Sequence, residues 1–298
     1  MRAVCGAAAV LVVVAVAFGI MAVVHNGSGS EGQSAAESLA QSAVTDAQGT
    51  NGSQASSSAS STAASDASLE ARAKDFAVDP NRTDWNYSTN GRKTVYLTID
   101  DGPSAMTPQV LDILDRYGCK ATFFVVGHND EYFPYIAEAF KRGHTIGLHS
   151  MTHDYAYIYS SVDAYYEDLE NIGQVVKDQI GFVPCFIRFP GGSSNMVSAS
   201  YTGGIMTTLT EGVQERGYQY YDWNLSVGDG SEHTSDEIAE YGMADDGNEN
   251  IMLLCHDSTT KQPTVDALPR IIEHYQSLGY TFEAIDRSSW VCHHGVSN

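Results

Sequence analysis

The folded part of the sequence predicts an α/β fold in which helices connect parallel strands. Short apolar runs rich in Val, Ile, Tyr and Phe alternate with helical patterns, which implies right-handed strand–helix–strand crossovers. An open doubly wound sheet and a closed barrel both satisfy this pattern. Seven strand candidates, with the polar residues of interest at their C-terminal ends, favour the barrel. No glycine-rich phosphate loop follows the first strand, which argues against a dinucleotide-binding fold.

The elements can be placed in order along the chain. The predicted strands cover residues 94–99, 121–126, 145–148, 183–188, 218–223, 251–255 and 280–285. The predicted helices cover residues 107–117, 132–142, 162–179, 207–215 and 264–278, with a weaker helix at 236–242. A glycine, the usual helix stop, follows several of them: Gly118, Gly143, Gly181, Gly217 and Gly279.

Two further segments precede this part. Residues 3–24 form an unbroken apolar run after Arg2, long enough to span a bilayer, which takes roughly 20 residues. We therefore predict an uncleaved signal anchor, a transmembrane helix at residues 1–25; a cleaved signal peptide is the alternative. Residues 26–71, rich in Ser, Ala and Gly, predict a disordered linker. The folded domain, residues 72–298, then lies outside the cytoplasm at the cell membrane, or is secreted if the segment is cleaved.

Composition limits the possible partners. The 298 residues carry a formal net charge of -21, which argues against nucleic-acid binding because no basic footprint is available. An acidic surface fits a solvated exterior or one that avoids anionic polymers, and a monomer is expected. Besides Cys5 in the apolar run, four cysteines remain: Cys119, Cys185, Cys255 and Cys292. They allow three disulfide pairings outside the cytoplasm, or serve as small buried side chains.

The first predicted strand ends on two adjacent carboxylates, Asp100 and Asp101, before Gly102-Pro103 turns the chain away. Neighbouring strand residues point to opposite faces, so these two share a site only where the strand breaks into its loop. Two like charges so close require a cation or an arginine nearby.

Other strand ends supply ligands for a cation and also an arginine. His149 and His153 follow the third strand, four residues apart, and with one carboxylate they form the three-ligand set of a catalytic divalent metal. Taken alone, such a pair is weak evidence. Arg188 leaves an apolar strand, where its burial is costly without a partner, and Asp100 is the obvious one. The Pro-Gly-Gly that begins at Pro190 exposes backbone N–H groups suited to an oxyanion.

The last strand ends add an imidazole and apolar walls. His256 directly follows a buried apolar strand, where its pKa near neutrality suits a general acid. Trp223 and Leu254 can wall an apolar pocket. Taken singly, Trp223 equally fits core packing and His256 a hydrogen-bonded core histidine.

Together these motifs resemble, in order, the five motifs of the NodB-like polysaccharide deacetylases, carbohydrate esterase family 4. The resemblance covers about residues 92–287 and implies an incomplete (β/α) barrel of about seven parallel strands. It also implies that Asp101, His149 and His153 bind a divalent metal, zinc or another such as cobalt. Asp100 is then the general base.

The same resemblance implies the remaining roles. Arg188 pairs with the general base and keeps it ionised, and His256 is the general acid. Gly191 donates its backbone N–H to the oxyanion. Trp223 and Leu254 line the pocket that accepts the acetyl methyl group.

Two positions depart from the family pattern, and the fourth motif is ambiguous. Ile99 stands where the family commonly has Phe, and Gly191 stands where many members have Tyr. Glycine retains the backbone donor but alters the wall of the groove. Either Asp222 or Asp229 can be the acid that orients the last histidine.

The function expected from this resemblance is metal-dependent removal of N-acetyl groups from an extracellular glycan, above all N-acetylglucosamine of peptidoglycan. A chitin-like glycan, an exopolysaccharide or acetylxylan is the alternative substrate. An inactive glycan-binding module is the alternative from a different class of protein. A metallopeptidase is disfavoured, because the sequence lacks a glutamate base within a helical zinc motif.

Overall fold

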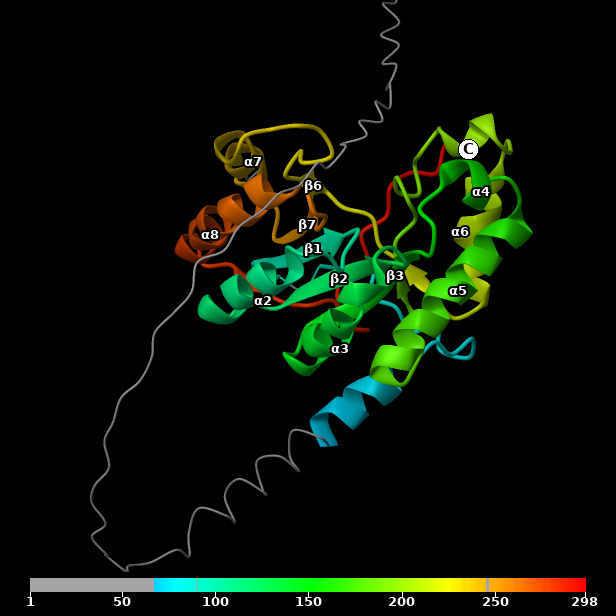
Figure 1. Cartoon of the computed structure of the whole chain (residues 1–298), viewed down its shortest axis with the longest axis horizontal. Coiled ribbons are helices and arrows are strands. Elements are labelled where there is room, and N and C mark those ends of the chain that lie inside the picture. The colour runs from blue at the N-terminus through cyan, green and yellow to red at the C-terminus, as the bar shows by residue number, and fades with distance from the viewer. Residues whose placement is uncertain (1–66, 90, 245–246) are drawn as a thin grey trace, which may run out of the picture. The chain divides into compact units, whose positions relative to one another are not determined.

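The computed structural model describes residues 67–89, 91–244 and 247–298 (Figure 1). Within these ranges the strands are β1 (Thr94–Asp100), β2 (Ala121–Val126), β3 (Thr145–Ser150), β4 (Phe186–Ile187), β5 (Gln219–Tyr220), β6 (Leu225–Ser226), β7 (Asn250–His256) and β8 (Thr281–Phe282). The helices are α2 (Thr107–Arg116), α3 (Pro134–Lys141), α4 (Tyr155–Ile158), α5 (Val162–Ile180), α6 (Ile205–Glu215), α7 (Ser235–Gly242) and α8 (Gln262–Ser277). Two 3-10 turns, Asp130–Tyr132 and Ser198–Ser200, and a helix at residues 67–76 complete them.

All strand pairs are parallel, in the order β5-β4-β3-β2-β1-β7-β6, with β8 beside the start of β1. The sheet must curl, because its two end strands, β5 and β6, are joined by only the four residues 221–224. Residues 292–294 pack along this seam, beside β5 and the connection that follows it: the Asp222 N–H donates to the Cys292 carbonyl at 2.8 Å, and His293 stacks on Tyr220 with ring centroids 3.7 Å apart. The expected incomplete (β/α) barrel is confirmed.

Strand β1 lies inside the sheet, between β2 and β7, and is buried along its whole length, as expected for a parallel strand covered on both faces. Its side chains alternate, so Tyr96, Thr98 and Asp100 share one face. The opposite residues on β7 are Met252, Leu254 and His256.

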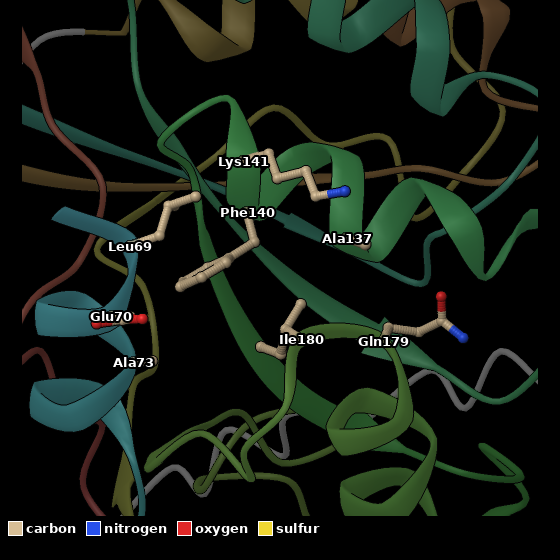
Figure 2. Close-up of a pocket in the computed structure, with 8 residues that line it drawn as sticks. All are labelled: Leu69, Glu70, Ala73, Ala137, Phe140, Lys141, Gln179 and Ile180. Carbon is tan, nitrogen blue, oxygen red and sulfur yellow. The ribbon is translucent and has the colours of Figure 1, made fainter. Parts of the chain in front are cut away.

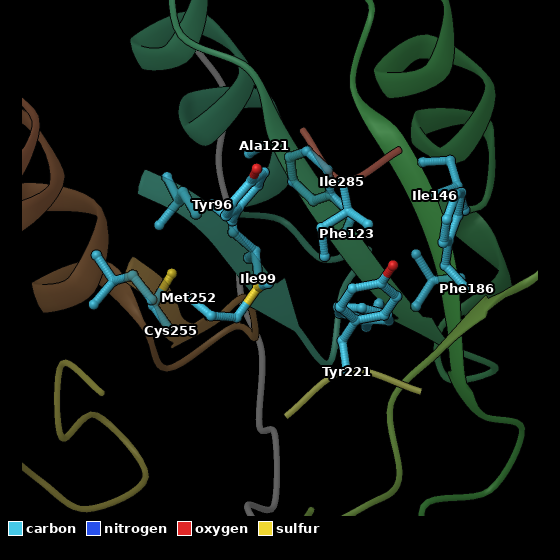
Figure 3. Close-up of a cluster of buried hydrophobic side chains, with 14 of the residues drawn as sticks. Tyr96, Ile99, Ala121, Phe123, Ile146, Phe186, Tyr221, Met252, Cys255 and Ile285 are labelled. Atoms are coloured by element: carbon cyan, nitrogen blue, oxygen red, sulfur yellow. The ribbon is translucent and has the colours of Figure 1, made fainter. Parts of the chain in front are cut away.

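Large apolar side chains from most of the strands form one continuous core. Figure 3 shows part of it, with Tyr96, Phe123, Phe186 and Tyr221 drawn from β1, β2, β4 and the segment after β5. Phe186 packs edge-on against Tyr221, with ring centroids 6.2 Å apart. This core packs beneath the C-terminal strand ends. The polar residues of the site gather at those strand ends.

The seven predicted strands are all present, although three are shorter than expected. Predicted strand 183–188 is reduced to β4 because its first residues pair with another segment: Cys185 N–H donates to the Phe76 carbonyl at 2.8 Å, and Val78 N–H donates to the Val183 carbonyl at 2.9 Å. Strand β6 and helix α4 were not predicted. Both are only two to four residues long, too short to show a periodic pattern.

The helix at residues 67–76 begins within the segment that the sequence assigns to the linker. Leu69 and Ala73 line a small pocket with Phe140 of α3 and Ile180 of α5 (Figure 2). Arg72 donates to the Phe140 and His144 carbonyls at 3.1 and 2.7 Å. These contacts attach the helix to the barrel.

The predicted transmembrane helix at residues 1–25, together with Cys5, lies outside the described residues. Within the described part, no helix is both long enough and apolar enough to cross a membrane. Among the described residues, the cysteines Cys119, Cys185, Cys255 and Cys292 are buried and form no disulfide. They therefore act as small core side chains.

Candidate metal and catalytic centre

The polar residues predicted for the site meet at the C-terminal ends of β1, β3, β4 and β7. Parallel strands bring these ends to one edge of the sheet, and the register places Asp100 directly beside His256. Asp101 follows β1, while Arg188 follows β4. The strand order thus assembles residues that are far apart in the sequence.

Asp101, His149 and His153 form a cluster whose potential ligand atoms all lie within 4.8 Å of one another. Asp101 Oδ1 lies 3.6 Å from His149 Nε2 and 3.5 Å from His153 Nε2. Asp101 and His153 have left-handed backbones, with φ of 71° and 49°. Such conformations cost about 1–3 kcal/mol and concentrate at functional sites.

The hydrogen bonds of this cluster leave its acceptors facing one another. His149 Nδ1 donates to the Arg188 carbonyl at 2.7 Å, so its Nε2 presents a lone pair toward Asp101. Asp101 Oδ1 is buried and has no hydrogen-bond partner among the residues that the structure describes. A carboxylate oxygen and two imidazole nitrogens converging without a donor between them fit a divalent cation such as zinc.

The charges of the cluster favour this donor set. Burial raises the pKa of Asp101, but attraction to His149 and then His153 outweighs it, so the pKa lies below its ordinary value. Burial, followed by repulsion from His149, lowers the pKa of His153. An ionised carboxylate and a neutral imidazole are the forms that bind a metal.

A β-bulge and a buried aspartate position the two histidines. The β2–β3 register slips between Val125 and Val126, leaving His149 as an extra residue, and bulges redirect side chains near active sites. Asp168 of α5 accepts four hydrogen bonds of 2.6–2.9 Å from Ser150, Met151 and Thr152. Asp168 therefore holds the loop between the histidines.

Arg188 is fully buried and hydrogen-bonded through every guanidinium nitrogen. Nη1 donates to Asp100 at 2.9 Å and to Thr98 at 2.7 Å, while Nε and Nη2 donate to the Tyr221 and Asp222 carbonyls at 2.8 and 2.9 Å. The guanidinium also lies 4.4 Å above the Phe124 ring. The predicted pairing of Arg188 with Asp100 is present, and it offsets the cost of burying both charges.

The structure distinguishes the two acids that the sequence left open. Asp229 accepts from His256 Nδ1 at 2.7 Å, whereas Asp222 accepts from Ser193 and from the His294 N–H. Burial lowers the pKa of His256, but the hydrogen bond and charge of Asp229 outweigh it, so the pKa lies above its ordinary value. Asp229 is thus the acid that orients His256.

Gly191 and Gly192 form the wall beside these groups. Gly191 has φ 78°, and its N–H has no acceptor within the described part of the chain. A side chain at Gly192 would meet the Trp223 ring at 3.0 Å, so the ring packs directly on this backbone. Leu254 is buried but lies outside the continuous core.

Two supporting residues were missed by sequence reasoning. Asp168 lies on the apolar stripe of α5, between Tyr165 and Ile172, and a charge at such a position is a signal that could have identified it. Asp257 accepts from the hydroxyls of Ser104 and Thr107, and its N–H donates to the Asp100 carbonyl at 2.7 Å. It holds the loop that follows the two carboxylates.

An α/β half-barrel with acids, imidazoles and an arginine at its C-terminal strand ends belongs to the class of barrel proteins whose chemistry occurs at that rim. The family model for polysaccharide deacetylases matches residues 87–203. A Bacillus cereus peptidoglycan-N-acetylglucosamine deacetylase is 30% identical over 220 residues, 71% of this chain and 77% of that protein. The chain therefore belongs to the polysaccharide deacetylase family, as the sequence motifs predicted.

Two more similarities are informative. The catalytic domain of a peptidoglycan N-acetylglucosamine deacetylase from Eubacterium rectale is 42% identical, with a TM-score of 0.69, and the match covers 74% of this chain and all of that one. A bifunctional xylanase/deacetylase from Pseudobutyrivibrio xylanivorans is 30% identical over 66% of this chain and 31% of that protein.

Proposed function

We propose that the protein is a metal-dependent deacetylase that removes the N-acetyl group from N-acetylglucosamine of peptidoglycan, outside the cell membrane. Membership of the family supports a deacetylase that acts on a glycan. The observation that carries the metal dependence is the cluster of Asp101, His149 and His153, with Asp100 and His256 beside it.

Asp101, His149 and His153 would hold the metal, zinc or cobalt by their donor set. When bound, it supplies a Lewis acid and lowers the pKa of a coordinated water from 15.7 toward about 7. Asp100 takes a proton from the attacking water, and Arg188 holds that carboxylate in position through its 2.9 Å hydrogen bond.

The remaining groups act on the substrate. The free N–H of Gly191 donates to the acetyl oxygen as negative charge develops on it. His256 Nε2 then donates its proton to the departing amine as the C–N bond breaks, while Asp229 holds Nδ1. The products are acetate and a glucosamine residue. Trp223 and Leu254 supply the apolar wall for the acetyl methyl group.

The names of the relatives support peptidoglycan as the substrate. The apolar run at residues 3–24 supports action outside the cytoplasm. The xylanase/deacetylase relative supports acetylxylan as the second candidate.

The experiment is acetate release from peptidoglycan, a chitooligosaccharide and acetylxylan, with and without a chelator. Release that is fastest from peptidoglycan and abolished by the chelator is expected. The matched control is Asp100→Asn, which preserves the size of the side chain. Release unaffected by the chelator contradicts the metal dependence, and no release from any substrate favours a glycan-binding module.

A further inference from the structure

Tyr155 of α4 lies at the mouth of the site, two residues after His153. Its ring packs edge-on against His153 and against Tyr159, with centroids 5.6 Å away in both cases. Tyr159 is itself fixed, because it is fully buried and its hydroxyl donates to the Pro190 carbonyl at 2.7 Å. The Tyr155 ring is therefore held between the histidine loop and the Pro-Gly-Gly segment.

The Tyr155 hydroxyl occupies the space above Gly191. A Cβ on Gly191 would lie 2.6 Å from this oxygen, closer than real side chains tolerate. The absent side chain at Gly191 thus makes room for Tyr155.

Two hydrogen-bond donors lie close together at this point. Within the described residues, neither the Tyr155 hydroxyl nor the Gly191 N–H makes a hydrogen bond to the protein. Because a Cβ lies about 2.5 Å from its own backbone nitrogen, the two donors lie within about 5 Å of each other. One oxygen can accept from both, since hydrogen bonds are about 2.7–3.0 Å long.

We propose that Tyr155 is a further catalytic residue, whose hydroxyl donates to the acetyl oxygen of the substrate together with the Gly191 N–H. The inference rests on the proposed deacetylase function. A phenol is protonated at neutral pH and is a good donor. This hydrogen bond strengthens as the acetyl oxygen becomes an oxyanion. It therefore lowers the barrier of the chemical step and raises kcat.

The first test is Tyr155→Phe, which removes only the hydroxyl. We expect kcat to fall about 100-fold, with little change in KM. The matched control is Tyr157→Phe on the same helix, where the partly buried ring packs against the core; wild-type kinetics are expected. An unchanged kcat, or a higher KM with unchanged kcat, overturns the proposal.

A second variant tests whether Tyr155 and Gly191 act on the same oxygen. Gly191→Ala places a methyl group against the Tyr155 hydroxyl, so Tyr155→Phe should cost much less in the Gly191→Ala background than in the wild type. Independent effects of the two substitutions contradict a shared oxygen.

Binding of acetate separates this inference from the proposed function. Calorimetric titration with acetate needs no turnover, and we expect about 10-fold weaker binding to Tyr155→Phe, which corresponds to one lost hydrogen bond. A wild type that releases no acetate from glycans overturns the proposed function. An active wild type whose Tyr155→Phe variant matches it in kcat and acetate affinity overturns only the role of Tyr155.

Discussion

The Arg188 guanidinium donates a 2.9 Å hydrogen bond to a carboxylate oxygen of Asp100, and both side chains are almost completely buried. Buried ion pairs of this kind are costly to break from one side, because the remaining charge has no partner. The same ion pair therefore contributes to the stability of the fold and fixes the position of the proposed base, Asp100.

Arg188→Met should destabilise the protein by about 3–5 kcal/mol, measured by urea unfolding. Asp100→Asn combined with Arg188→Met should cost less than Arg188→Met alone, because no buried charge is left unpaired. Arg270→Met is the control, since Arg270 pairs with the exposed Asp236 and should change stability by less than about 1 kcal/mol. Equal effects of the two arginine substitutions contradict this view.

Asp100→Asn should abolish acetate release while the protein still binds one divalent ion. An amide cannot accept the proton of water, and loss of a general base costs about 10²–10⁴-fold in rate. The proposed ligands Asp101, His149 and His153 remain intact. Metal content by atomic emission checks the prediction, with Asp101→Asn as the comparison that should lose metal. Metal lost from both variants would show that Asp100 is itself a ligand.

Asp229→Asn should move the alkaline limb of the kcat/KM–pH profile to lower pH. The proposed acid is the protonated form of His256, which is present below its pKa and lost as pH rises through it. The carboxylate of Asp229 raises that pKa, so removing its charge lowers the pKa. Asp222→Asn should leave the limb in place, because Asp222 contacts Ser193 and His294 instead. A limb that shifts only with Asp222→Asn refutes the assignment.

Asp168→Asn should weaken metal binding by about 10–100-fold, the usual effect of losing a residue that orients ligands. The amide can accept at only one of its two former acceptor positions, which loosens the loop between His149 and His153. Competition with a chromogenic chelator measures the affinity. Asp178→Asn on the exposed face of the same helix is the control, and a similar loss in that variant contradicts a specific role for Asp168.

The parts of the fold that depend on local pattern could be predicted from the sequence. Strand β1 and its terminal carboxylates, Asp100 and Asp101, could be recognised because the apolar run and the two acids are adjacent in the sequence. The choice between Asp222 and Asp229 could not be made, because it depends on which strand edge each acid meets once the barrel has formed. Asp229 meets β7 at His256, while Asp222 meets residues 292–294 across the seam.

The same limit applies to Asp168 and Tyr155. Asp168 acts through the hydroxyl and N–H groups of another element. The place of Tyr155 follows from the missing side chain at Gly191, which a linear reading identifies only as a departure from the family pattern.

The seam of the barrel bears on the order in which the site is completed during synthesis. The Tyr221 and Asp222 carbonyls hold Arg188, and Asp222 is in turn held by residues 292–294. Because chains are synthesised from the N-terminus and a domain folds as a unit, β1 and its carboxylates leave the ribosome long before these last contacts exist. Asp100 thus acquires its fully supported partner only after His294 has been synthesised, and a nascent chain shorter than this should be inactive however well its first strands have folded.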